Sequence, residues 1–196
     1  SPYRNLAYNQ VVTTDLGDYQ LSGAPLVDGR VVFFPAALLT DGWASWLGLD
    51  LRAQIAIGIR TVDADGNEFK SSYSNYHLGA LGRIPVGKHA VRAFAGYAMQ
   101  TFTLESKTGN ITSPTPNTDY RMLRAGAGGD LQLTDKFAVG LEAAWLQFLS
   151  VGQIGEWFPR SSAGGIEVGT ELTYAVTPMF YARGFGSYER VFFDFK

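Results

Sequence analysis

Ten charged residues spread through the chain are the side chains best suited to chemistry. Paired carboxylates can act as general acid and base, and Glu142, Glu167 and Glu171 are the candidates for such a pair or for a narrow ion path. Acidic and basic residues in near balance can instead neutralise each other as ion pairs, which buried charges require. We predict that second, structural role for the whole set, which comprises Asp50, Arg52, Arg60, Arg92, Arg124, Asp130, Glu142, Glu167, Glu171 and Arg183.

Other reactive side chains are few. The two histidines, His77 and His89, have no serine or aspartate partner evident in the sequence, so a histidine-dependent hydrolase site is not expected. Nucleophile-elbow, phosphate-loop and zinc spacings are missing. The stretch from Asp63 to Glu68 offers several oxygen ligands, but Glu68 and Ser74 stand where a calcium-binding EF-hand loop needs glycine and glutamate. We therefore predict no catalytic residue, no metal and no cofactor.

The charged residues lie on segments that alternate between polar and apolar side chains. From Leu47 to Thr61, every odd position up to Ile59 is aliphatic or alanine, and the even positions carry charge, amide, alanine or glycine. A period of two is typical of a β-strand. Its length exceeds the roughly 5 to 6 residues usual in soluble sheets and suits a transmembrane barrel strand, which needs about 9 to 11.

Further segments repeat this alternation. Residues 91–100, 123–133, 137–145 and 166–174 follow it clearly, and residues 71–84 follow it less clearly. Arg30 to Pro35 and Met179 to Phe195 are also predicted strands, and Tyr3 to Thr13 would be a ninth. In a membrane the apolar rows would face lipid and the charged rows the lumen. The predicted lipid-facing residues are Leu49, Leu51, Ile55, Ile57, Val139, Leu141, Val168 and Leu172.

Tight and long connections alternate along the chain, as in an up-and-down meander. The tight ones lie at residues 85–88, 133–136 and 176–178, and the long ones at 63–70, 105–118 and 150–162. In outer-membrane barrels short turns are periplasmic and long loops external. The connection from Ala36 to Trp46, with Phe33, Phe34 and Trp43, indicates a periplasmic aromatic belt. A capping loop or short helix is the alternative in a soluble protein.

Composition narrows the class of protein. The 196 residues suit one domain, 1–196. They include no apolar run of about 18 residues, so a membrane-spanning helix is not expected. Cysteine is absent, and a net charge of -2 gives no electrostatic reason to bind nucleic acid. Because the chain opens at Ser1-Pro2 without a methionine, we expect a processed or trimmed product.

Together these features predict an all-β fold, a transmembrane antiparallel up-and-down β-barrel of eight to ten strands. Ten strands are favoured, because bacterial barrels have even strand numbers and the strand at Arg30 to Pro35 needs an ascending partner before it. From about Arg30 to Phe195 the pattern resembles small bacterial outer-membrane barrels, of the kind that includes the outer-membrane protein A and X families. The stretch from Val31 to Leu39 is similar to uncharacterised barrels of myxobacteria-like species.

The resemblance implies a place in the outer membrane of a Gram-negative cell, with membrane lipid and other envelope proteins as partners. Members of such families act as anchors, adhesion or assembly components, minor pores or occasional lipid-modifying enzymes. We expect a non-enzymatic anchor or assembly component that acts through its loops or a periplasmic partner. The alternatives are a narrow porin-like channel and a soluble lipocalin-like barrel, whose aliphatic faces would point inward around an apolar ligand.

Overall fold

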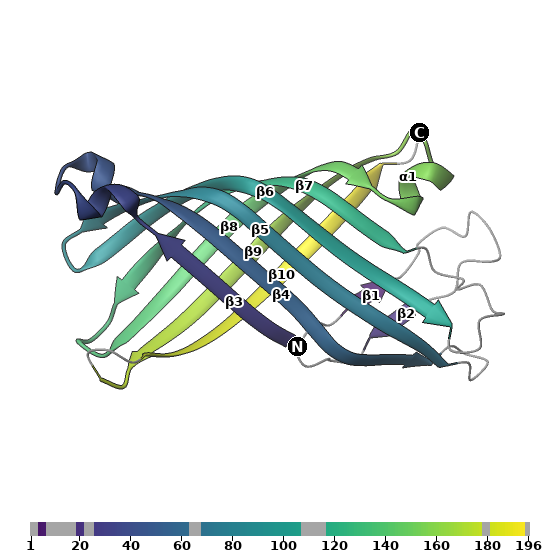
Figure 1. Cartoon of the computed structure of the whole chain (residues 1–196), viewed down its shortest axis with the longest axis horizontal. Helices are drawn as coiled ribbons and strands as arrows, with labels where there is room; N and C mark the ends of the chain where they lie inside the picture. The colour runs from purple at the N-terminus through teal and green to yellow at the C-terminus, as the bar shows by residue number, and fades with distance from the viewer. Residues whose placement is uncertain are drawn as a thin grey trace.

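The computed structural model describes residues 4–6, 19–21, 26–62, 68–106, 117–177 and 181–194. Its main feature is one eight-stranded antiparallel sheet in which each strand pairs with its neighbours in sequence (Figure 1). The strands are β3 (Leu26–Phe33), β4 (Leu47–Val62), β5 (Glu68–Val86), β6 (His89–Ser106), β7 (Thr118–Gln132), β8 (Phe137–Val151), β9 (Ser162–Ala175) and β10 (Tyr181–Asp194). The predicted all-β, up-and-down architecture is confirmed.

The strand number differs from the favoured ten. The sheet contains eight strands, the lower end of the predicted range. Of the expected strand from Tyr3 to Thr13, the described part is β1 (Arg4–Leu6), which pairs with β2 (Tyr19–Leu21) in a separate two-stranded sheet. Because eight is an even number, the first and last strands of the sheet run in opposite directions, and no further pair of strands is needed. β3 begins at Leu26, earlier than the predicted Arg30.

The sheet curls strongly, so it has a concave and a convex face. The guanidinium carbon of Arg52 in β4 lies 5.0 Å from the ring centroid of Phe185 in β10, although these strands stand near opposite edges of the sheet. Among the described residues β3 and β10 form the two edges and are not hydrogen-bonded to each other. The sheet is therefore a partly closed barrel, and we call the space bounded by its concave face the lumen.

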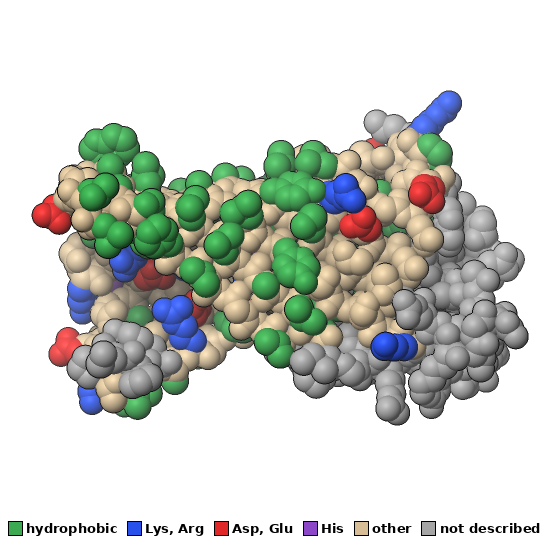
Figure 2. Space-filling view, in the orientation of Figure 1, with side chains coloured by type: hydrophobic (Ala, Val, Ile, Leu, Met, Phe, Trp, Pro, Cys, Tyr) green, Lys and Arg blue, Asp and Glu red, His purple; other side chains and the backbone are tan. Residues whose placement is uncertain are grey.

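Alternation places apolar side chains on the convex face, where they cover much of the outer surface seen in Figure 2. Leu51 is 44% exposed, whereas its neighbour Asp50 is 2% exposed. Of the predicted lipid-facing residues, Val139 is half-buried and the side chain of Ile57 lies outside the described part. The others are exposed on the convex face: Leu49, Leu51, Ile55, Leu141, Val168 and Leu172.

The connections define two ends of the sheet. The turn end carries the connections 87–88 and 133–136 and the end of β9 with residues 176–177. It also carries the link from β3 to β4, which contains two 3-10 helices, η1 (Pro35–Leu38) and η2 (Trp43–Trp46). The loop end carries the connections after β4, β6 and β8, the last with a short helix, α1 (Gln153–Trp157). Residues 63–67, with most of the loop tested for calcium, and 107–116 lie outside the described residues.

Strand register brings charged and small residues into rows across the concave face. One row runs from Arg92 in β6 through Gly128 in β7 and Glu142 in β8 to Gly169 in β9. Charged side chains and glycines alternate along it. Because residues directly opposite in a sheet lie only about 5 Å apart, the glycines leave room for the long side chains beside them.

Candidate functional site

A network of ion pairs covers the concave face at mid-height, and we call it the charge network. Its centre is Arg124 of β7, which the structure places between two carboxylates. Nε of Arg124 lies 2.7 Å from Oε2 of Glu167 in β9, and Nη2 of Arg124 lies 2.8 Å from Oε1 of Glu142 in β8. The guanidinium carbon also lies 4.3 Å from the ring centroid of Phe94. A buried guanidinium held in this way has two charge-assisted hydrogen bonds and a cation–π contact.

Arg92 of β6 extends the network toward the turn end. Its Nη2 lies 3.1 Å from Oδ1 of Asp130 and 4.0 Å from Oε2 of Glu142. Asp130 also faces Arg83 at 3.7 Å. Glu142 therefore connects Arg92 and Arg124, and predicted residues from four strands, β6 to β9, form one continuous set.

A second group of ion pairs joins β3 to β4. Arg30 donates from Nε and Nη2 to the two carboxylate oxygens of Asp50, at 2.9 and 2.7 Å. Arg52 donates from Nε to Oδ2 of Asp28 at 2.8 Å, and Gln54 donates to the same oxygen. The predicted set omits both Asp28 and Arg30. Asp28 lies before the predicted strand, and extending the alternation back to Leu26 is the signal that finds it. Arg30 is the first residue of the predicted strand, and its place in the same alternation as Asp28 is the signal for it.

The remaining predicted members are less tightly held. Arg183 of β10 lies 3.7 Å from Glu171, and the Arg183 side chain is 61% exposed, so this pair is weak. Arg60 belongs to β4, but its side chain lies outside the described part. The structure thus brings seven of the ten predicted residues into ion pairs of 3.1 Å or less and leaves Glu171 and Arg183 in a weak pair beside the open edge.

A cavity of about 270 Å³ lies on the concave face beside the network. It reaches across the lumen, from β3 and β4 to β10, and both signs of charge line it: Asp28, Arg30, Arg52, Arg92, Glu142, Glu171 and Arg183. A smaller cavity next to it is lined by His77 and Gln100. Nε2 of His77 and Oε1 of Gln100 are buried and have no hydrogen-bond partner among the described residues. Buried polar atoms of this kind are normally satisfied by water.

The two histidines occupy different places. His77 faces the lumen from β5, as predicted from the alternation of that strand, and is 9% exposed. His89, at the start of β6, accepts a hydrogen bond at Nδ1 from the backbone N–H of Gln132. The hydrogen bond of His89 is to a backbone N–H, and Nε2 of His77 has no partner among the described residues, whereas a catalytic histidine pairs with a nucleophile or a carboxylate.

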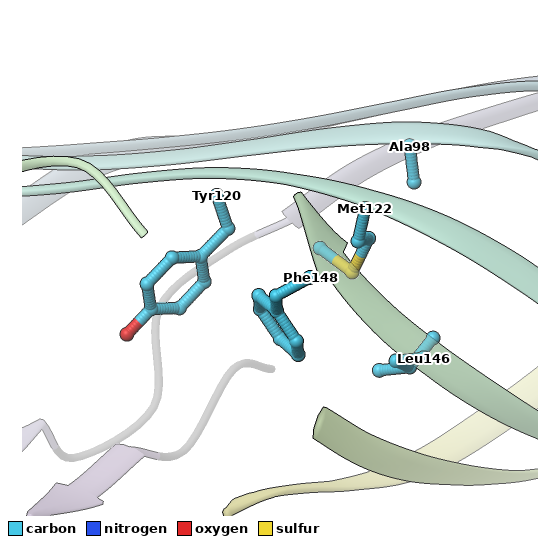
Figure 3. Packing of buried hydrophobic residues seen from close by; sticks show 5 residues of the cluster. All are labelled: Ala98, Tyr120, Met122, Leu146 and Phe148. Atoms are coloured by element: carbon cyan, nitrogen blue, oxygen red, sulfur yellow. The ribbon is translucent and has the colours of Figure 1, made fainter. Parts of the chain in front are cut away.

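An apolar cluster closes the loop-end side of the network (Figure 3). It comprises Ala98, Tyr120, Met122, Leu146 and Phe148, from β6, β7 and β8, which converge inside the sheet. The rings of Tyr120 and Phe148 meet edge to face, with centroids 5.1 Å apart. Val191 and Phe193 of β10 pack against the same cluster, and Val191 stands in the register row of Leu146 with Gly165 of β9 between them.

A smaller apolar group lies one register row closer to the turn end than Arg124. Leu81, Phe94 and Ala144 are buried together, and Phe34 from the β3–β4 link packs against them. This differs from the predicted belt, in which Phe34 was to face the membrane interface. Phe34 is the first residue after β3 and turns into the lumen instead, whereas the neighbouring Phe33 is exposed. This small group therefore lies within the charge network, between the row of Arg92 and Glu142 and the row of Arg124.

Comparison with protein-family models, curated proteins and solved structures finds no match to this chain. Within the described residues, no helix has the length and apolar character to cross a bilayer, and no group of three or more His, Cys, Asp or Glu side chains is arranged to hold a metal ion.

Proposed function

We propose that this chain is a non-enzymatic β-barrel of the bacterial outer membrane, which serves as an anchor or assembly component through its loops or a periplasmic partner. The observation that carries the proposal is the distribution of side chains between the two faces. Leu49, Leu51 and Ile55 are exposed on the convex face, while Asp50 and Arg124 are buried on the concave face. A transmembrane barrel has this inverted arrangement, with apolar residues toward lipid and polar ones toward the lumen.

Closure of the barrel is part of the proposal. Unpaired backbone groups at the edges of β3 and β10 would be costly in hydrocarbon, where closed barrels satisfy every backbone hydrogen bond. The edges are antiparallel, and Arg52 and Phe185 already meet across the lumen. Direct pairing of β3 with β10 is the simplest closure.

The alternatives fit the arrangement less well. A lipocalin-like barrel requires the aliphatic faces to point inward, whereas Leu51 and Ile55 point outward. A channel requires a continuous polar path, and the 270 Å³ cavity supplies part of one. The buried apolar cluster around Leu146 and Phe148 occupies the concave face on the loop-end side of that cavity, which favours an anchor over a pore.

Two matched substitutions test the membrane assignment. Ile55 lies near the middle of β4 and Leu133 lies at the turn end just past β7, and both are exposed. In vesicles, Ile55→Arg should lower the free energy of unfolding by about 2 to 4 kcal/mol, and Leu133→Arg by about 0 to 1 kcal/mol. In plain buffer the wild-type chain should need detergent to stay monodisperse. Equal, small effects of both substitutions, together with solubility without detergent, would reject the proposal.

A further inference from the structure

The link between β3 and β4, residues 34–46, exposes large apolar side chains at the turn end. Leu38 is 76%, Leu39 89% and Trp43 70% exposed. In Figure 2 hydrophobic side chains stand out at the corner that η1 and η2 occupy in Figure 1. Soluble proteins rarely present adjacent large apolar groups in this way unless something covers them.

This link is a folded segment. The backbone N–H of Ala37 donates to Phe34, and those of Leu39 and Thr40 both donate to the carbonyl of Ala36. Around the following turn, Gly42 donates to Oγ1 of Thr40 at 3.1 Å, and Oγ of Ser45 donates to the Gly42 carbonyl at 2.7 Å. Polar groups satisfied within a segment lower the cost of moving it into an apolar environment.

Phe34 fixes the position of this segment. Its ring packs inside the sheet against Leu81, Phe94 and Ala144. Gly48 lies directly against the ring, since a Cβ built there would be 2.9 Å from Cδ1 of Phe34. One short, internally hydrogen-bonded segment therefore carries both the inward Phe34 and the outward Leu38, Leu39 and Trp43. Because Phe34 is anchored, the three outward side chains are held at a fixed position along the barrel axis.

We propose that residues 34–46 form a lipid-contacting foot, which places Leu38, Leu39 and Trp43 in the membrane interface at the turn end. The inference rests on the proposed function, because it assumes a barrel in a bilayer. Its apolar surface continues that of the adjacent convex face, where Val31, Phe33 and Leu47 are exposed. Tryptophan prefers this interface.

The charge of the segment favours lipid over a protein partner. Asp41 is the single charged residue between positions 34 and 46, and the segment contains no lysine or arginine. The segment therefore has no pattern of charges that could recognise a complementary protein surface. The tight turns at the same end carry the charged residues Lys88 and Lys136. The apolar foot is therefore on one side of the barrel, beside β3 and β4.

The test uses depth-dependent quenching of tryptophan fluorescence. Two single-tryptophan proteins are made by changing the other three tryptophans to phenylalanine, one keeping Trp43 and the other Trp145. Trp145 is exposed on the convex face near the middle of β8. Both proteins are folded into phosphatidylcholine vesicles with bromine either near the headgroup or deep in the acyl chain. We expect stronger loss of Trp43 emission with the shallow bromine and of Trp145 emission with the deep one.

The outcomes separate the two proposals. Quenching of Trp145 without quenching of Trp43 by either lipid would overturn the foot and leave the barrel in the membrane. Absence of quenching at both residues would overturn the membrane barrel itself. If Trp43 is shielded from aqueous iodide yet unquenched by bromine, a protein surface or second copy covers it, and the lipid foot is again overturned.

A variant of the foot gives a second readout. In the Trp43 protein, Leu38→Glu with Leu39→Glu should abolish the quenching by shallow bromine, because buried carboxylates would be costly in the interface. Lys88→Glu is the matched control, since it changes the net charge by the same two units at an exposed turn of the same end, and it should retain most of the quenching. Unchanged quenching in the double variant would contradict insertion of the leucines.

Discussion

Arg30 and Arg52 lie directly opposite each other in the register of β3 and β4, and each is neutralised by a carboxylate of the other strand. Arg30 binds Asp50 of β4, and Arg52 binds Asp28 of β3. Like charges directly opposite in a sheet are destabilising. The crossed ion pairs make this opposition tolerable, and each arginine depends on its own aspartate.

The first prediction concerns these two aspartates. Asp50→Asn should destabilise the protein by about 3 to 5 kcal/mol, because it leaves the half-buried Arg30 without its bidentate partner. Asp28→Asn should cost less, since Arg52 keeps its contact with Phe185 and Asp28 is less buried. Urea unfolding of the two variants in vesicles, beside wild type, measures both effects. A smaller loss in Asp50→Asn than in Asp28→Asn would contradict this account of the pairs.

The second prediction concerns Arg124. Arg124→Met should be strongly destabilising, by about 3 to 5 kcal/mol, because Glu142 and Glu167 then lose the guanidinium between them. Adding Glu142→Gln and Glu167→Gln to Arg124→Met should restore much of the loss, since no uncompensated carboxylate remains beside it. The rescue distinguishes a charge network from simple packing, in which the triple variant would be the least stable.

The third prediction concerns closure between β3 and β10. Gly29 and Gly186 are on the convex face of the edge strands, and a Cβ at either meets no atom within 4 Å. The wild-type chain has no cysteine, so Gly29→Cys with Gly186→Cys creates a unique pair. A closed barrel should form this disulfide under mild oxidation, visible as a faster band on a non-reducing gel.

The control for closure displaces one cysteine along β10. Gly29→Cys with Ala182→Cys moves the second thiol by about 13 Å along the strand, beyond disulfide reach. This pair should stay reduced. Crosslinking of neither pair, or of both equally, would count against a fixed pairing of the edges.

The fourth prediction concerns conduction. Wild-type protein in planar bilayers should give no stepwise current, because Leu146 and Phe148 belong to a buried apolar cluster on the concave face. Leu146→Ser with Phe148→Ser should introduce current, since it makes that layer polar. Leu141→Ser is the matched control on the convex face of the same strand, and it should leave the bilayer silent. Steady current through the wild-type protein would support the channel alternative.

Local alternation predicted the strands well, because a sheet with one apolar face imposes a period of two on every strand. It also separated Leu51 from Asp50 and His77 from Leu78 by face. The contacts depend on register and curvature, which no single strand encodes. The alignment and curl of the strands from β4 to β10 place Arg124 between Glu142 and Glu167. The same curvature brings Arg52 to Phe185.

The errors have local causes. Asp28 was missed because the strand begins before the apolar run that marked it. Phe34 was assigned to the interface with its aromatic neighbours, but η1 begins immediately after it, and the change from strand to helix reverses which way a side chain points. A belt predicted from aromatic composition alone does not take such a change of side-chain direction into account.

The row of Arg92, Gly128, Glu142 and Gly169 has a consequence for how this interior can change. Barrels of about eight strands have interiors just wide enough for side chains, and here the missing Cβ atoms supply the width. A Cβ at Gly169 would lie 3.1 Å from Cγ of Glu142. A larger side chain at either glycine would therefore need the volume that a charged side chain now fills. In evolution or design, placing a new group in the interior requires removal of an ion pair, without any change in the number of strands.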